Sequence, residues 1–336
     1  MKIQTLIFSI LFLVSCNQLT DYKESFQLAK YETDKGKYTE AIALLDKIIQ
    51  SEPDFDSAYA ERAYNYLLIE KPEQAIQDVN KAIEINFNNI DAYFIRGLIY
   101  GYLFEYDKAL KDYTHIIRLG DSTYISVALR ERANIYYATQ EIEKSIKDLS
   151  EIIEMDSLNH EIYVSRGIAR LRHDVYEKYA DSVKISLSDS TLYSNFFRFF
   201  KIVYSSNDNK SIMYDTKGAI SDFSKAIKIN PDYSDAYYNK AKVYEDLGLE
   251  EEALVDINKA IQLDEKSDYY MTRALFYKTL KESEKSLNDF NKAIEINPNN
   301  GFAYINRGYL KKEQFNDNKG AEKDINMAEK LGIKTD

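Results

Sequence analysis

Two helical patterns of apolar residues alternate along most of the chain, separated by short polar turns such as EYDK (105–108) and LGLEE (247–251). One pattern recurs with the same Asp and the same Lys-Ala-Ile at 221–230 (SDFSKAIKIN), 255–264 (VDINKAIQLD) and 288–297 (NDFNKAIEIN). Successive copies start 34 and then 33 residues apart. Recurrence at such a fixed spacing is typical of a protein built by stacking one supersecondary unit. The pattern therefore predicts a helix–turn–helix unit repeated along the chain.

The second pattern precedes the first in each unit, as in YFIRGLIY (93–100) and YYNKAKVY (237–244). Together the two patterns resemble the tetratricopeptide repeat (TPR), a 34-residue helix–turn–helix with small residues at positions 8 and 20 and often proline at position 32. Small residues are needed there because the two helices of one repeat cross closely. Position 8 is occupied by Ala29, Ala63, Gly97, Ala133, Gly167, Ala241, Ala274 and Gly308. Position 20 is occupied by Ala41, Ala75, Ala109, Ser145, Ala219, Ala253, Ser286 and Ala321.

The resemblance implies an all-α protein, a TPR solenoid that forms a right-handed superhelix and occupies residues 22–336. The scarcity of turn residues, with 11 glycines and 4 prolines, also favours helices joined by short connections. We expect about eight repeats. Their ranges are 22–55, 56–89, 90–123, 126–159, 160–233 with an insertion, 234–266, 267–300 and 301–334.

A second correlation links positions 7 and 23 of the repeats. In the first repeat both are leucine (Leu28 and Leu44), whereas in the others a basic residue accompanies an aspartate. This joint change predicts a structural ladder in which the two residues of each pair contact each other. The alternative is a solvated charged surface. The pairs are Arg62–Asp78, Arg96–Asp112, Arg132–Asp148, Arg166–Asp222, Lys240–Asp256, Arg273–Asp289 and Arg307–Asp324.

The fifth repeat contains 40 additional residues, at about 174–213. They form either an inserted helical hairpin or a ninth, degenerate repeat. A ninth repeat separates Arg166 from Asp222, whereas an insertion lets them pair, and we favour the insertion. Its segment NFFRFFKIVY (195–204) contains Arg198 and Lys201 and is too short to span a membrane. We expect this segment to pack on the solenoid or to provide a second docking site through Phe196, Phe197, Phe199 and Phe200.

The N-terminus has the features of a secretory signal peptide. Lys2 precedes an apolar stretch from Ile3 to Val14, which is too short for a stable membrane-spanning helix. The sequence LVSC (13–16) resembles the bacterial lipobox, where a cysteine is acylated and becomes the new N-terminus. We expect residues 1–15 to be a lipoprotein signal peptide, Cys16 to be the lipid attachment site and 16–21 to be a tether. The alternative is an ordinary signal peptide that contains a cysteine.

Charge and composition narrow the range of functions. A net charge of −11 disfavours nucleic acid as a partner. The single cysteine leaves no disulfide, and no thiol nucleophile remains once Cys16 is acylated. The three histidines, at 115, 160 and 173, lack metal-binding spacing such as HExxH. The sequence therefore predicts no enzyme, with no catalytic residues, no metal and no cofactor.

In the TPR family the concave surface of the solenoid binds partners through positions 2, 5, 9, 12 and 13. The resemblance implies a protein or peptide partner and a function as a scaffold or adaptor in the bacterial cell envelope. The lipid on Cys16 would tether it to a membrane, with the outer membrane favoured, on either the periplasmic or the surface side. The alternative is a lipoprotein of the outer membrane that captures glycans or nutrients. The implied groove residues are Tyr64, Leu68, Phe94, Leu98, Tyr102, Tyr137, Tyr238 and Tyr309.

Overall fold

The computed structural model describes residues 22–179 and 212–333, and within these ranges every regular element is a helix. The chain divides into two compact units, residues 1–141 and 142–336, here called the N-terminal part and the C-terminal part. Each is described by itself. The predicted signal peptide, the tether and the phenylalanines at 196–200 lie outside the described residues.

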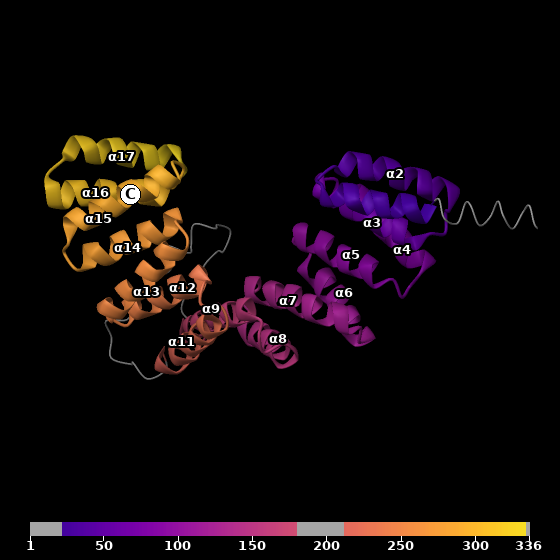
Figure 1. The fold of residues 1–336 in the computed structure, drawn as a ribbon, viewed down its shortest axis with the longest axis horizontal. Coiled ribbons are helices and arrows are strands. Elements are labelled where there is room, and N and C mark those ends of the chain that lie inside the picture. Colours follow the sequence, from indigo (N-terminus) through magenta and orange to yellow (C-terminus); the bar gives the residue numbers. More distant parts are fainter. Residues whose placement is uncertain (1–21, 180–211, 334–336) are drawn as a thin grey trace, which may run out of the picture. The chain divides into compact units, whose positions relative to one another are not determined.

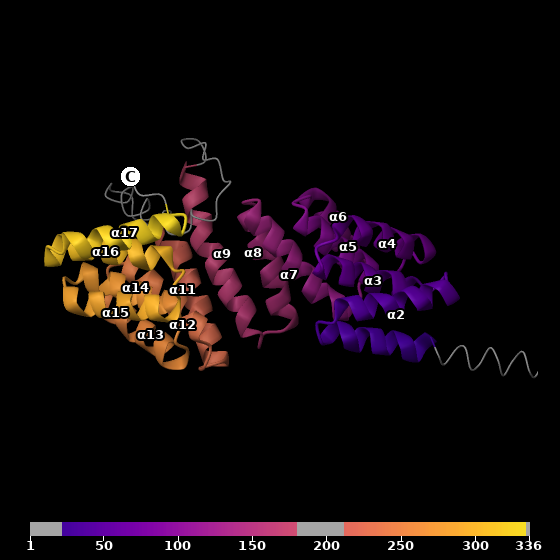
Figure 2. The same cartoon turned by 90° about the horizontal axis from the view of Figure 1, so that it is seen from above.

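The N-terminal part consists of a helical segment at 22–34 and six further helices, which pack against one another in chain order (Figure 1). The helices that begin successive repeats also lie side by side, α3 against α5 and α5 against α7. The view in Figure 2 shows α3, α4, α5 and α6 as neighbouring rods. The helices are α2 (Tyr38–Ser51), α3 (Asp56–Leu68), α4 (Pro72–Ile85), α5 (Ile90–Tyr102), α6 (Tyr106–Leu119) and α7 (Ser122–Ala138).

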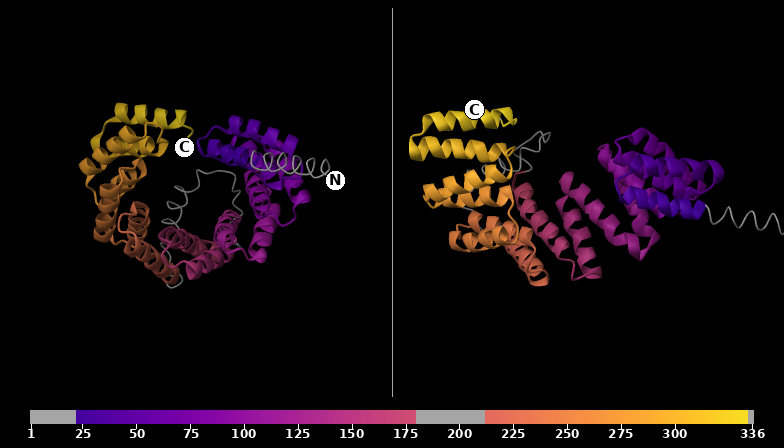
Figure 3. Two further views of the ribbon diagram at one scale, coloured as in Figure 1. Left: turned by 45° about the vertical axis from the view of Figure 1, so that its right-hand side comes forward. Right: turned by 45° about the horizontal axis from the view of Figure 1, so that its top comes forward.

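The C-terminal part begins with the second helix of the fourth repeat and continues as helix pairs that stack on one another (Figure 3). Its helices are α8 (Ile142–Met155), α9 (His160–Tyr179), α11 (Ile212–Ile229), α12 (Ser234–Asp246), α13 (Glu250–Leu263), α14 (Ser267–Thr279), α15 (Ser283–Ile296), α16 (Gly301–Phe315) and α17 (Asn318–Lys330). The expected all-α repeat fold is confirmed. The last repeat has one extra residue in its first helix and turn. Its predicted ladder residues, Arg307 and Asp324, are therefore 17 positions apart, whereas those of the seventh repeat are 16 apart.

Local sequence signals set the ends of these helices. Pro53, Pro231 and Pro298 each follow the end of a helix by two residues, because proline cannot continue it. Asn89 and Asn300 cap α5 and α16 by accepting a hydrogen bond from the backbone N–H three residues later. These signals explain why helix boundaries repeat with the sequence.

In the seven repeats whose internal turn is described, that turn contains one residue in the left-handed region. This residue is glycine in the first and sixth repeats, Gly36 and Gly248, where the lack of a side chain permits positive φ. The other described turns use residues with side chains, namely Glu70, Phe104, Gln140, Lys281 and Asn316. A residue with a Cβ in this region costs about 1 kcal/mol relative to glycine. Phe104 (φ 58°) is the bulkiest of them.

Small residues at positions 8 and 20 are buried throughout, which allows the two helices of a repeat to approach closely. Two glycines at position 8 face an aromatic ring on the second helix. A Cβ added to Gly97 would lie 2.8 Å from Cε1 of Tyr113, and one added to Gly167 would lie 2.6 Å from Cε1 of Phe223. Real Cβ atoms do not approach other atoms so closely, so the rings of Tyr113 and Phe223 as placed leave no room for a Cβ at these two glycines. The seventh repeat instead packs Phe290 against Ala274 at the same two positions.

Six of the seven predicted ladder pairs lie entirely within the N-terminal part or entirely within the C-terminal part. In each of these six, the basic residue lies within hydrogen-bonding distance of its aspartate. In five of these six repeats the arginine Nε and Nη2 both donate to the aspartate, at 2.7 to 3.0 Å. In the sixth repeat Lys240 Nζ lies 3.1 Å from Oδ2 of Asp256. Arg132 and Asp148 belong to different parts, so this pair stays a prediction.

The ladder arginines also donate a hydrogen bond to the preceding repeat, which the sequence pattern does not predict. Nη1 donates to position 25 on the second helix of the preceding repeat, for example to Asn80 from Arg96 at 3.0 Å and to Asn291 from Arg307 at 2.8 Å. Arg132 likewise donates to Thr114 at 3.1 Å. Each such arginine therefore joins two repeats as well as two helices.

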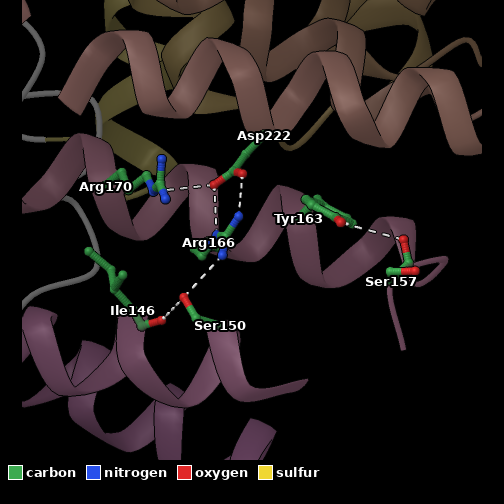
Figure 4. Close-up of polar contacts among 7 residues, drawn as sticks. All are labelled: Ile146, Ser150, Ser157, Tyr163, Arg166, Arg170 and Asp222. Atoms are coloured by element: carbon green, nitrogen blue, oxygen red, sulfur yellow. Dashed lines mark hydrogen bonds and ion pairs between the residues drawn. The ribbon is translucent and has the colours of Figure 1, made fainter. Parts of the chain in front are cut away.

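Helices α9 and α11 pack together as the two helices of one repeat, although residues 180–211 separate them. Figure 4 shows Arg166 and Asp222 meeting between them, with Nε–Oδ2 at 3.0 Å and Nη2–Oδ1 at 2.7 Å. Arg170 Nε also approaches Asp222, at 3.3 Å. Both helices are longer than those of the other repeats. The additional sequence is thus accommodated between the two helices of one intact repeat.

Candidate functional site

A hollow of about 300 Å³ lies between α5, α6 and α7 in the N-terminal part. Two of the eight implied groove residues, Leu98 and Tyr102, are among the residues that line it. Its size is at the lower end of ligand pockets, which suits one or two side chains of a partner. The complete lining, here called the α5–α7 pocket, is Leu98, Gly101, Tyr102, Tyr106, Tyr113, Glu131, Asn134, Ile135 and Ala138.

The edge of the α5–α7 pocket carries unusually exposed apolar side chains. Tyr102 is 52% exposed, Leu103 37% and Phe104 77%. The Phe104 ring lies edge-on to that of Tyr106, with centroids 6.1 Å apart. Contiguous apolar side chains exposed beside a concave surface are typical of an interaction site.

Two glycines of α5 lie at or next to this pocket. Gly97 and Gly101 are four residues apart and therefore share one face of α5. The ring of Tyr113 covers Gly97, whereas a Cβ added to Gly101 would have no neighbour within 4 Å. The bare backbone at Gly101 thus contributes to the volume of the pocket.

The polar groups of the pocket come from α7. The Glu131 side chain is 26% exposed, and its Oε1 lies 3.6 Å from Nε of Arg130. Asn134 Nδ2 donates a weak hydrogen bond of 3.4 Å to Glu131 Oε2. Burial raises the pKa of Tyr113, and the charges of Glu131 and Asp112 raise it further, so the phenol stays protonated at neutral pH. The pocket therefore combines aromatic walls with one carboxylate.

The other implied groove residues have different surroundings. Phe94 is half-buried, with its ring 5.9 Å from that of Tyr113, and Tyr64 packs against the core around Ala63 and Val79. Leu68 is exposed, and Tyr137 and Tyr309 are half-buried. Phe94 and Tyr64 therefore contribute to the packing of the helices.

In the C-terminal part the implied groove residue Tyr238 stacks on Tyr269, with centroids 4.8 Å apart. Lys242 Nζ lies 5.2 Å from the centroid of the Tyr238 ring, and burial lowers the pKa of Lys242. Burial likewise raises the pKa of Tyr238. These side chains are therefore packed among themselves.

Sequence reasoning missed Gly101, Tyr106, Tyr113 and Glu131 as lining residues. The signal that could have revealed them is the pair of glycines on one face of α5, opposite an aromatic at position 24. The described residues form no cluster of three or more side chains suited to a metal ion. In the same ranges no helix has both the length and the apolar character needed to cross a membrane.

Comparisons with known proteins agree with this fold. A family model described as tetratricopeptide repeat matches residues 56–89, 90–119, 234–267 and 267–300, and one described as TPR repeat matches 215–248. The crystal structure of a tetratricopeptide repeat protein from Parabacteroides merdae has a TM-score of 0.54 and 18% identity, covering 92% of this chain and 99% of that one. The C-terminal part of a TPR repeat-containing protein from Cytophaga hutchinsonii has a TM-score of 0.56 and 16% identity, covering 83% and 97%.

Curated relatives match over shorter fractions of their length. A TPR repeat-containing protein of Methanocaldococcus jannaschii is 25% identical over 74% of this chain and 52% of its own. Human sperm-associated antigen 1 is 28% identical over 71% of this chain and 25% of its own. The chain thus spans about half or less of these relatives. The matched models and the solved structures together show that the chain contains tetratricopeptide repeats and folds as a solenoid of them.

Proposed function

We propose that this protein is a scaffold that binds a protein or peptide partner in the α5–α7 pocket and holds it at a bacterial membrane. The single observation that carries the proposal is that hollow, lined by Leu98 and Tyr102 at implied groove positions and edged by exposed Tyr102, Leu103 and Phe104. Aromatic side chains are frequent anchors of protein interfaces because they bury large areas at a low cost in conformational entropy.

The side chain of Phe104 supports this function. The left-handed residue of the other described turns is a glycine or a polar or charged residue, whereas Phe104 is aromatic and 77% exposed. An exposed phenylalanine that contributes little to the core is explained if it contacts a partner.

The membrane tether is the second component of the proposal. Acyl groups on Cys16 would anchor the chain at one end, since each buried CH₂ contributes about 0.8 kcal/mol and several chains together bind durably. Tethering raises the local concentration of the partner without any catalysis. Cys16→Ala should move the protein from the membrane fraction to the soluble fraction and abolish its labelling by a palmitate analogue.

A crosslinking pull-down from membranes tests the groove. Gly101→Leu places an apolar side chain in the pocket at a position where a Cβ meets no neighbour within 4 Å, so partner recovery should fall while the melting temperature holds. The matched control is Gln77→Leu, which adds the same apolar side chain at an exposed position on α4, outside the lining residues. Equal recovery of the same partners by both variants and the wild type would refute the proposal.

A further inference from the structure

The lining of the α5–α7 pocket has a chemical asymmetry. Two accessible tyrosines, Tyr102 and Tyr106, and the buried Tyr113 line the pocket, and Glu131 supplies the only charge among the lining residues. Leu98 and Ile135 supply aliphatic surface. No lysine or arginine lines this pocket. It is therefore apolar and aromatic with a single negative group.

The carboxylate of Glu131 is only weakly paired. Its contact with Arg130 is 3.6 Å long, on a guanidinium that is itself 45% exposed, and its hydrogen bond from Asn134 is 3.4 Å long. The ladder carboxylates, by comparison, accept two hydrogen bonds of 2.7 to 3.0 Å from an arginine. Glu131 thus retains the capacity to accept a strong charge-assisted hydrogen bond.

The tyrosines of the pocket also differ from their neighbours. In the same part, Arg62 lies over Tyr59, Arg96 over Tyr93 and Lys108 over Tyr100, each within 6 Å of the ring centroid. Within the described residues, no lysine or arginine lies in this way over the rings of Tyr102, Tyr106 and Tyr113. The negative face of an aromatic ring attracts a cation, and Tyr102, which is 52% exposed, is accessible to a cation on a partner.

We propose that the α5–α7 pocket binds the cationic side chain of a lysine or arginine on the partner. Its aliphatic stem packs against Leu98, and its charged head lies beside the rings of Tyr102 and Tyr106 and bonds to Glu131. This assignment rests on the proposed function and names the partner chemistry that the pocket selects. The net charge of −11 on the chain favours the approach of a basic segment from a distance.

A selection from a random peptide library displayed on phage tests this assignment. The full-length protein, held in detergent, is used as bait, and peptides that also bind Gly101→Leu are removed. The remaining peptides should be enriched in lysine or arginine, and replacing that residue by norleucine should weaken binding about tenfold. Binding should also weaken as the salt concentration rises, because part of the attraction is between charges.

Two variants that each remove one negative charge distinguish the effect of the Glu131 carboxylate on peptide binding from the effect of the net charge of the protein. Glu131→Gln should weaken the selected peptides about tenfold and remove the preference for a basic residue. Glu73→Gln, at an exposed position on α4, removes the same charge outside the pocket and should change binding less than twofold. Circular dichroism and the melting temperature verify that both variants are folded.

The outcomes distinguish this inference from the proposed function. Peptides that need an open pocket but show no basic preference, or that bind Glu131→Gln as well as the wild type, would overturn the cation site and leave the groove intact. A selection that yields no peptide dependent on the open pocket would overturn both.

Discussion

Arg166 on α9 donates two hydrogen bonds to Asp222 on α11, although 56 positions separate them in the sequence. Their side chains are 15% and 5% exposed, and Nη1 of the same arginine reaches Ser150 on α8 at 3.0 Å. The Arg166 side chain therefore joins the two helices of the fifth repeat, α9 and α11, and also contacts α8 of the preceding repeat (Figure 4).

The first prediction concerns the cost of breaking this pair. Asp222→Asn should lower the free energy of unfolding by about 3 kcal/mol, because it leaves the arginine charge poorly compensated in a mostly buried place. Urea unfolding followed by circular dichroism measures the change. Glu84→Gln, which breaks the exposed pair of Lys81 and Glu84, is the control and should cost less than about 0.5 kcal/mol.

A double-mutant cycle with Arg166→Leu shows whether the two residues act as a pair. We expect the double variant to be more stable than the sum of the single effects predicts, since the second change removes the uncompensated charge. Strictly additive effects would mean that the ladder is a set of independent surface charges.

The second prediction uses the ladder position that holds lysine. Burial raises the pKa of Asp256, and the attraction of Lys240 only partly offsets it. At Asp324, burial also acts to raise the pKa, but hydrogen bonds from Arg307 and Lys311 outweigh it and lower the pKa. Lys240→Arg should therefore lower the pKa of Asp256 and stabilise the fold by about 1 kcal/mol at neutral pH.

The pH dependence of this variant has a definite sign. A raised folded-state pKa makes the wild-type Asp256 contribute stability at low pH that is lost as the pH rises through that pKa. A lowered pKa reverses the sign, so the advantage of the variant should grow as the pH rises through the Asp range. Carboxyl NMR titration and urea unfolding at pH 3 and pH 7 measure both effects; an equal advantage at the two pH values would contradict this explanation.

The third prediction tests the close approach at Gly97. Gly97→Ala places a Cβ 2.8 Å from Cε1 of Tyr113 and should destabilise the fold by about 1–3 kcal/mol. Gly101→Ala, one turn away with open space around it, should stabilise by about 0.5–1 kcal/mol because alanine favours helix. Combining Gly97→Ala with Tyr113→Leu should cost less than the two single changes together. If Gly97→Ala proves as harmless as Gly101→Ala, α5 and α6 do not pack as described.

The fourth prediction separates stability from binding at Phe104. Phe104→Gly should stabilise the fold by about 1 kcal/mol, because glycine adopts positive φ without strain. The same change should weaken partner binding, because it removes the most exposed aromatic beside the pocket. Lys281→Gly relieves the same backbone strain in the C-terminal part and should leave binding unchanged. If Phe104→Gly and Lys281→Gly change partner binding equally, Phe104 contacts no partner.

The repeat pattern predicted the fold because each helix carries its own signals, such as Pro53 after α2 and the small residues at positions 8 and 20. The contact between Arg166 and Asp222 was also predictable, since it depends only on repeat register. The contacts to position 25 were not predictable, because the residue type there varies. The acceptors are Asp46, Asn80, Thr114 and Ser150. The pocket was predicted only in part. Its depth depends on the missing side chain of Gly101 and on the ring of Tyr113, and both effects arise from packing between helices.

Photocrosslinking at the pocket measures the central claim most directly. A photoreactive amino acid replaces Tyr102 in the pocket or Gln77 on the exposed face of α4, and membranes are irradiated with the protein in place. We expect crosslinks to a defined partner from position 102, their loss when Gly101→Leu is added, and none to that partner from position 77. Crosslinks to the same partner from both positions, or their persistence in the filled pocket, would contradict it.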